Sequence, residues 1–189
     1  MPTCASGSQS AGPAARSIDG VGDLAPLIVT AELPEALQSR ADQLRREHYP
    51  PERNQLRAHV TLFRALPPSL GEELCDVLAV EARAKTVSAR LEGVMNLGRG
   101  TALRLVSPAM IALRERLAER FFGLLTPQDE HTPVLHVTVQ NKVSPSDAKA
   151  LQRQLAASIE PRDFAFAGLA LHRYRGGPWE AVRRWPFRG

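Results

Sequence analysis

The chain has 189 residues, of which 43% are hydrophobic, and its formal net charge is +4. This length and apolar content suffice for one compact domain or two packed half-domains, and they argue against a disordered chain. No apolar run is long enough to span a membrane, and the N-terminus lacks the pattern of a signal peptide, so a cytoplasmic location is expected by default. The mild basic excess is nearly all arginine, which permits a nucleotide or RNA partner without demonstrating one.

Residues 1–22 are rich in Ser, Ala, Gly and Pro without periodicity. They predict a flexible N-terminal extension, which leaves residues 23–189 as the folded domain. The chain has two cysteines. Cys4 lies in the extension and Cys75 lies among apolar neighbours of a predicted helix, so neither predicts a disulfide framework or a zinc site.

Strands and helices alternate along the rest of the chain. In the first half, apolar and β-branched runs predict strands at 27–31, 58–63, 87–97 and 102–106, and apolar residues at helical spacing predict helices at 33–49 and 70–80. In the second half, the same signals predict helices that begin at Pro108 and Ser144 and strands at 135–139, 164–172 and 179–182.

The pattern repeats at the separation of His59 and His136, which is 136 − 59 = 77 residues. This shift also aligns the Pro-Ser pair at 68–69 with the pair at 145–146, and it aligns the apolar faces of the helices that follow. Two copies of one unit predict an α+β fold of two lobes, roughly 23–98 and 99–189, related by a pseudo-twofold axis.

Each copy carries a His-Val-Thr tripeptide on a predicted strand, and alternate side chains of a strand share a face. The side chains predicted to share the face of a motif histidine are Thr61 and Phe63 beside His59, and Thr138, Gln140 and Lys142 beside His136. A pseudo-twofold axis would bring both faces to one cleft. There, one neutral imidazole can take a proton from water, the other can protonate a leaving oxygen, and the threonine hydroxyls can bind phosphate.

Residues 59–62 read His-Val-Thr-Leu and residues 136–139 read His-Val-Thr-Val, which resembles the paired motifs of the 2H phosphoesterase superfamily. Its best-known branch is the RNA 2',3'-cyclic phosphodiesterases, also called 2'-5' RNA ligases. The resemblance implies a bilobal fold with two antiparallel sheets around a central cleft and helices outside. It also implies metal-independent hydrolysis of a 2',3'-cyclic phosphate to a 2'-phosphate, without a cofactor, and reversible 2'-5' ligation. In this family pattern His136 would be the base and His59 the acid.

Other residues are weaker candidates for substrate contact. They are Phe63, Arg104, Gln140, Lys142 and Tyr174, with Arg173 and Arg175 as further possible phosphate contacts. Members that act on RNA commonly continue the first motif with Arg-Phe, whereas this chain has Phe63 followed by Arg64. The alternation therefore predicts that Arg64 points away from the cleft.

Two other functions compete with this interpretation. A catalytic zinc site would need a third ligand, and no His, Asp or Glu follows either motif at ligand spacing. A non-catalytic RNA-binding or regulatory module could keep the fold and the basic charge without turnover. We expect a monomer whose partner is an RNA end or a small cyclic nucleotide. His48, His172 and Trp179 are predicted to be structural.

Overall fold

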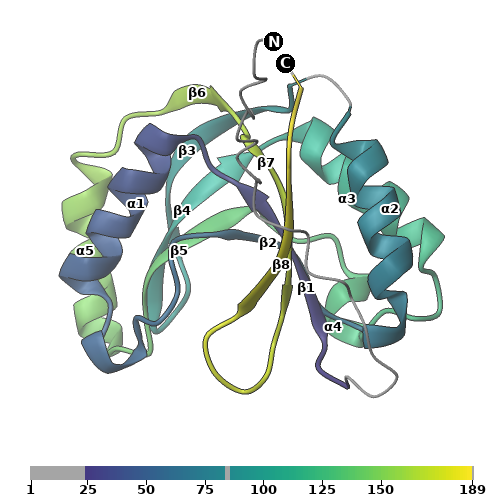
Figure 1. Cartoon of the computed structure of the whole chain (residues 1–189). Coiled ribbons are helices and arrows are strands. Elements are labelled where there is room, and N and C mark those ends of the chain that lie inside the picture. The colour runs from purple at the N-terminus through teal and green to yellow at the C-terminus, as the bar shows by residue number, and fades with distance from the viewer. Residues whose placement is uncertain (1–23, 84–85, 189) are drawn as a thin grey trace, which may run out of the picture.

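The computed structural model describes residues 24–83 and 86–188 (Figure 1). The predicted N-terminal extension lies outside these residues. Among the described residues, no helix is long and apolar enough to cross a membrane. The strands are β1 (Leu27–Glu32), β2 (Val60–Leu66), β3 (Ser88–Asn96), β4 (Gly100–Val106), β5 (His136–Asn141), β6 (Arg162–Ala165), β7 (Gly168–Arg173) and β8 (Glu180–Pro186). The helices are α1 (Glu35–His48), α2 (Gly71–Glu81), α3 (Pro108–Arg120), α4 (Pro127–Glu130) and α5 (Pro145–Ala156), with 3-10 turns at Pro51–Arg53 and Pro68–Leu70.

The described strands form two four-stranded sheets in which every pairing is antiparallel. One sheet has the order β2-β1-β7-β8 and the other has the order β5-β4-β3-β6. Helices α1 and α5 lie on one side of the molecule, and α2 and α3 lie on the opposite side (Figure 1). This arrangement confirms the predicted α+β fold with antiparallel sheets between outer helices.

The predicted division into contiguous lobes, 23–98 and 99–189, is wrong. Strand β3 follows the first copy of the repeat but pairs with β4, whereas β7 follows the second copy but pairs with β1. Each sheet therefore contains strands from both halves of the chain. The duplication remains visible because the strands of the two sheets correspond in order. Strands β2 and β1 of one sheet are equivalent to β5 and β4 of the other. The third strand of each sheet, β7 or β3, comes from the other copy of the repeat.

The predicted strand at 164–172 is divided between the two sheets. Residues Arg162–Ala165 pair with β3, and residues Gly168–Arg173 pair with β1. Between them, the Phe166 amide donates to the Val87 carbonyl and the Ala167 amide donates to the Glu32 carbonyl. Apolar alternation predicts extended backbone but carries no information about which sheet the backbone joins.

One hydrophobic core joins the sheets and their helices. The apolar residues of α1 at helical spacing, which are Leu37, Ala41 and Leu44, are all at most 3% exposed. Full burial of a leucine side chain stabilises the fold by about 1.5–3 kcal/mol. The helices are therefore held by these apolar faces, which the sequence already revealed.

Gly168 begins β7 at a point of close approach between strands. A Cβ atom at this position would clash with the backbone carbonyl oxygen of Trp185 on β8. We expect Gly168→Ala to lower the free energy of unfolding by about 1–3 kcal/mol, measured by urea denaturation. Gly71→Ala is the matched control, because its Cβ would meet only Leu27 Cδ1 at 3.8 Å and it begins a helix. Equal stability of the two variants would contradict the argument.

Candidate active site

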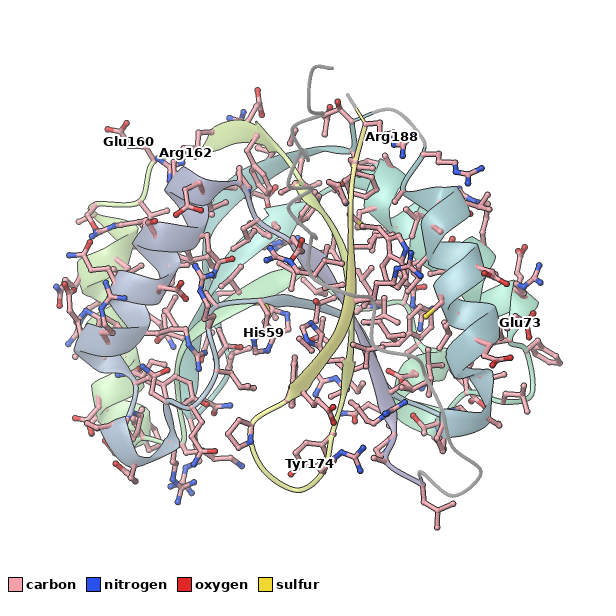
Figure 2. The ribbon with its side chains drawn as sticks, in the orientation of Figure 1. His59, Glu73, Glu160, Arg162, Tyr174 and Arg188 are labelled. Atoms are coloured by element: carbon pink, nitrogen blue, oxygen red, sulfur yellow. The ribbon has the colours of Figure 1, made fainter. Side chains whose placement is uncertain are left out.

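Both His-Val-Thr motifs line one cavity of about 460 Å³. Thr61 lies on β2 in one sheet and His59 directly precedes this strand, whereas His136 and Thr138 lie on β5 in the other sheet. In Figure 2, His59 lies near the centre of the molecule, between the two groups of helices. The cavity therefore combines equivalent residues from the two copies of the repeat.

The two histidines are held in the same way. His59 Nδ1 lies 2.8 Å from the carbonyl oxygen of Arg57, and His136 Nδ1 lies 2.7 Å from the carbonyl oxygen of Val134. A carbonyl can only accept, so Nδ1 carries a hydrogen in each ring and Nε2 is left for other partners. Each Nε2 can then accept a proton when the ring is neutral or donate one when it is charged.

A β-bulge directly after Thr61 reverses the predicted alternation of β2. Thr30 pairs with Thr61, whereas the preceding residue Val29 pairs with Phe63, so that Leu62 is an extra residue. Phe63 consequently points into the core and is fully buried. Its predicted role as a substrate contact is wrong. Arg64, which was predicted to point away, lines the cavity.

Strand β5 has a bulge at the equivalent position, directly after Thr138. Here Ala102 pairs with Thr138 and Thr101 pairs with Gln140, which leaves Val139 as the extra residue. Gln140 is 6% exposed, and its side-chain oxygen accepts a hydrogen bond from the Thr101 hydroxyl at 3.2 Å. Its predicted contact with substrate is therefore also wrong.

The remaining candidates are placed differently. Tyr174, in the loop between β7 and β8, lines the cavity. Arg104 lies opposite His136 on β4, but its guanidinium forms an ion pair with Glu92 and lies outside the cavity lining. Lys142 lies in the turn after β5, also outside the lining, with a backbone φ of 61°.

His131 and Trp179 are further cavity residues that were not predicted from the sequence as part of the site. His131 lines the cavity, although it lies in an irregular segment that gives no directional signal. Trp179 also lines it, and its ring centroid lies 4.5 Å from that of His59. Trp179 was predicted to be structural, and its place beside His59 depends on a contact between residues that are distant in the chain.

Burial lowers the pKa of His59 from 6.5 to about 4. The hydrogen bond to the Arg57 carbonyl raises this pKa, while the positive charges of Arg45, His172 and His136 lower it. His59 is therefore neutral in the free protein at pH 7, which is the protonation state of a base. This state is opposite to the acid role that the family resemblance implied.

The donor set of the cavity is poorly suited to a metal. Within residues 24–83 and 86–188, no three His, Cys, Asp or Glu side chains are grouped so that they could hold an ion. A protein site for zinc needs at least three such ligands. What the cavity does provide is the imidazoles of His59, His131 and His136, the hydroxyls of Thr61 and Thr138, and the side chain of Arg64.

Asp129 ties the segment before His136 to the bulged half of β2. This carboxylate is 3% exposed and accepts hydrogen bonds from the amides of Arg64 and Ala65 at 2.9–3.0 Å. Its own carbonyl oxygen accepts a hydrogen bond from Arg114, whose guanidinium stacks on Phe63. This Asp129 clamp connects the segments that carry the two motifs.

A family model described as the 2'-5' RNA ligase superfamily matches residues 33–178, which covers more than half of the chain. The chain belongs to the 2'-5' RNA ligase superfamily. This confirms the resemblance to the 2H phosphoesterases and indicates an enzyme of the phosphoesterase or ligase type. No curated protein matches the sequence at a significant level.

Solved structures share the fold at low sequence identity. TT0787 of Thermus thermophilus is 17% identical with a TM-score of 0.60, over 87% of this chain and 98% of that one. E. coli LigT complexed with 3'-AMP is 18% identical with a TM-score of 0.59, over 88% and 100% of the two chains. LigT complexed with NADP+ is 19% identical with a TM-score of 0.56, over 87% and 99%. At these identities the likeness establishes the fold alone.

The Asp129 clamp can be tested through stability. Asp129→Asn places an amide N–H against backbone donors, so we expect the free energy of unfolding to fall by about 1–3 kcal/mol. Asp163→Asn is the matched control, since Asp163 forms an exposed ion pair with Arg90 and its loss should cost less than about 1 kcal/mol. Urea denaturation measures both, and equal losses would contradict a special role for Asp129.

Proposed function

We propose that this protein hydrolyses a cyclic phosphodiester, specifically a 2',3'-cyclic phosphate on an RNA end or nucleotide, to a 2'-phosphate. Superfamily membership supports phosphoesterase or ligase chemistry in general. The observation that carries the finer proposal is the pairing of His59–Thr61 with His136–Thr138 in one cavity, with both Nε2 atoms left available by equivalent Nδ1 bonds.

The proposed reaction is an in-line displacement at phosphorus. His136 Nε2 takes a proton from water as the water oxygen bonds to phosphorus. The bond from phosphorus to O3' breaks on the opposite side, and His59 Nε2–H gives its proton to O3'. Thr61 and Thr138 donate hydrogen bonds to the non-bridging oxygens, and Arg64 adds positive charge at the cavity wall. These steps require no metal ion.

The acid role of His59 requires a change in its protonation. Its pKa of about 4 in the free protein means that the ring is neutral before substrate binds. A phosphate anion next to Nε2 favours the charged imidazole and raises this pKa. His59 therefore takes up a proton when a phosphate ligand binds. Between the pKa of His59 in the complex and its lower pKa in the free protein, the affinity for the ligand increases as the pH falls.

Turnover of 2',3'-cyclic nucleotides in excess EDTA is the direct test. We expect the wild-type protein to be active and His136→Ala to lose about 10²–10⁴-fold in kcat. His48→Ala is the matched control, since His48 ends α1 outside the cavity and its loss should leave kcat unchanged. Loss of activity in EDTA would contradict the metal-free mechanism.

The alternative is an RNA-binding or regulatory module that keeps the fold without turnover. The wild-type protein would then bind cyclic-phosphate RNA and 2'-5'-linked oligonucleotides without cleaving them. A substrate panel that includes cyclic mononucleotides separates the two functions, because a single cleaved member supports the enzyme.

The two histidine roles can be separated with a leaving group that needs no proton. On a p-nitrophenyl phosphodiester, His59→Ala should regain most of the wild-type rate, whereas His136→Ala should stay about 10²–10⁴-fold slower because water still needs a base. Initial rates of nitrophenolate release measure both variants. Rescue of His136→Ala alone would reverse the assignment, and near-wild-type rates for both on cyclic nucleotides would remove the histidines from the mechanism.

A further inference from the structure

Arg45 places a positive charge in the interior of the protein. It belongs to α1 and is 4% exposed. It lines neither the first cavity nor a second one of about 370 Å³, which adjoins the first at His59 and Trp179. A charged group that leaves water is costly unless fixed polar groups replace its hydration shell. The neighbours of Arg45 therefore have to supply these partners.

The hydrogen bonds of Arg45 join separate parts of the fold. Nε donates to the side-chain oxygen of Asn54 and to the carbonyl oxygen of Leu56, both at 3.1 Å, and Nη1 donates to the carbonyl oxygen of Thr138 at 2.8 Å. Asn54 and Leu56 lie in the segment that leads into His59. Thr138 is the motif threonine directly before the bulge of β5. One guanidinium therefore connects the first motif to the second.

Tyr49 restricts the guanidinium further. The Cζ atom of Arg45 lies 4.3 Å from the centroid of the Tyr49 ring. A planar guanidinium is attracted to an aromatic face and presents its N–H donors in fixed directions, whereas a lysine ammonium is a compact charge on a flexible stem. The hydrogen bonds to both motif segments therefore depend on an arginine at this position, and a positive charge alone does not replace them.

The charge of Arg45 acts on the first cavity. Burial lowers the pKa of Arg45, and Asp42, one turn earlier on α1, opposes this shift. The Asp42 carboxylate also accepts hydrogen bonds from Arg57 and from the Ala58 amide, so it is shared among several donors. In addition to burial, the positive charge of Arg45 lowers the pKa of His59. Arg45 is therefore coupled to His59 by its charge and to Thr138 by a hydrogen bond.

We propose that Arg45 is a positioning residue of the active site, which holds Thr138 at a fixed separation from the segment that carries His59. This inference rests on the proposed function. Arg45 does not line the cavity, so it acts through the Thr138 backbone and does not touch the substrate. Its contribution is to keep the Thr138 hydroxyl aimed at a phosphate oxygen while the two imidazoles face phosphorus.

Arg45→Lys tests the positioning role, because it keeps the charge and loses the planar fork of donors. We expect its kcat/KM on 2',3'-cyclic nucleotides to fall about tenfold or more, since the Thr138 hydroxyl is no longer held in place. Arg46→Lys is the matched control, because Arg46 is exposed on the same helix. Equal values of kcat/KM in the two variants would overturn the proposal.

A double-mutant cycle provides a readout that does not need turnover. The probe is inorganic phosphate, and calorimetric titration measures its Kd. We expect Arg45→Lys and Thr138→Val each to raise Kd about threefold or more, and the combined variant to agree with Thr138→Val within about twofold. If the two effects multiply in the combined variant, Arg45 does not act through Thr138 and the proposal is wrong.

The charge of Arg45 gives an independent readout at His59. Arg45→Gln removes the charge, so the pKa of His59 should rise from about 4, whereas Arg46→Gln should leave it unchanged. NMR titration of the His59 ring measures this pKa. The other charges that act on the ring, those of His172 and His136, are the same in both variants. An equal pKa in the two variants would contradict the coupling of Arg45 to the site.

The outcomes separate this inference from the proposed function. If the wild-type protein cleaves no cyclic phosphate, the proposed reaction is wrong, whereas the phosphate cycle and the His59 titration still decide the role of Arg45. If the wild type is active and Arg45→Lys matches Arg46→Lys, the role of Arg45 is wrong and the proposed reaction stands.

Discussion

Each motif strand contains one extra residue directly after its threonine, and the arrangement of the cleft depends on this pair of bulges. Without the bulge, Phe63 would share the face of His59 and Thr61, and Arg64 would point into the core. The bulge at Leu62 exchanges these positions, so that an aromatic ring fills the core and a guanidinium reaches the cavity. A bulge re-aims the side chains that directly follow it, because the side-chain period of a strand is two residues.

A bulge lies at the equivalent position in both copies of the repeat, but it changes the environment of different residue types. In the second copy the bulge places Gln140 in the interior. Burial of this amide is possible because its oxygen accepts a hydrogen bond from the Thr101 hydroxyl. The exchange of β3 and β7 between sheets then joins the two copies into one core. The motif histidines can therefore face one cavity from two different sheets, with the Asp129 clamp connecting the segments that hold them.

Burial sets the protonation state of His59 in the free protein. The carbonyl oxygen of Arg57 orients its ring, and burial lowers its pKa to about 4. Trp179 adds to this burial, because it packs on His59 from a hairpin outside the two motif strands. Burial disfavours the charged form of an imidazole, and a phosphate anion beside the ring acts in the opposite direction.

The sequence by itself determined which residue types could perform the chemistry and where most of the strands and helices lie, although helix α4 was not predicted. The His-Val-Thr motifs, the 77-residue separation of their histidines and the apolar faces of the helices are local patterns, and periodicity makes them readable. The paired motifs carried the family resemblance, the resemblance implied the antiparallel sheets, and both were confirmed.

Only the tertiary structure decided the faces of Phe63, Arg64 and Gln140, the sheet to which each strand belongs, and the second cavity beside His59. A bulge is defined by the partner strand, and the division at 166–167 is defined by carbonyls at Val87 and Glu32 that are distant in the chain. The cavities likewise depend on where Trp179 packs. Contacts between residues far apart in sequence decide these features, and no local pattern contains them.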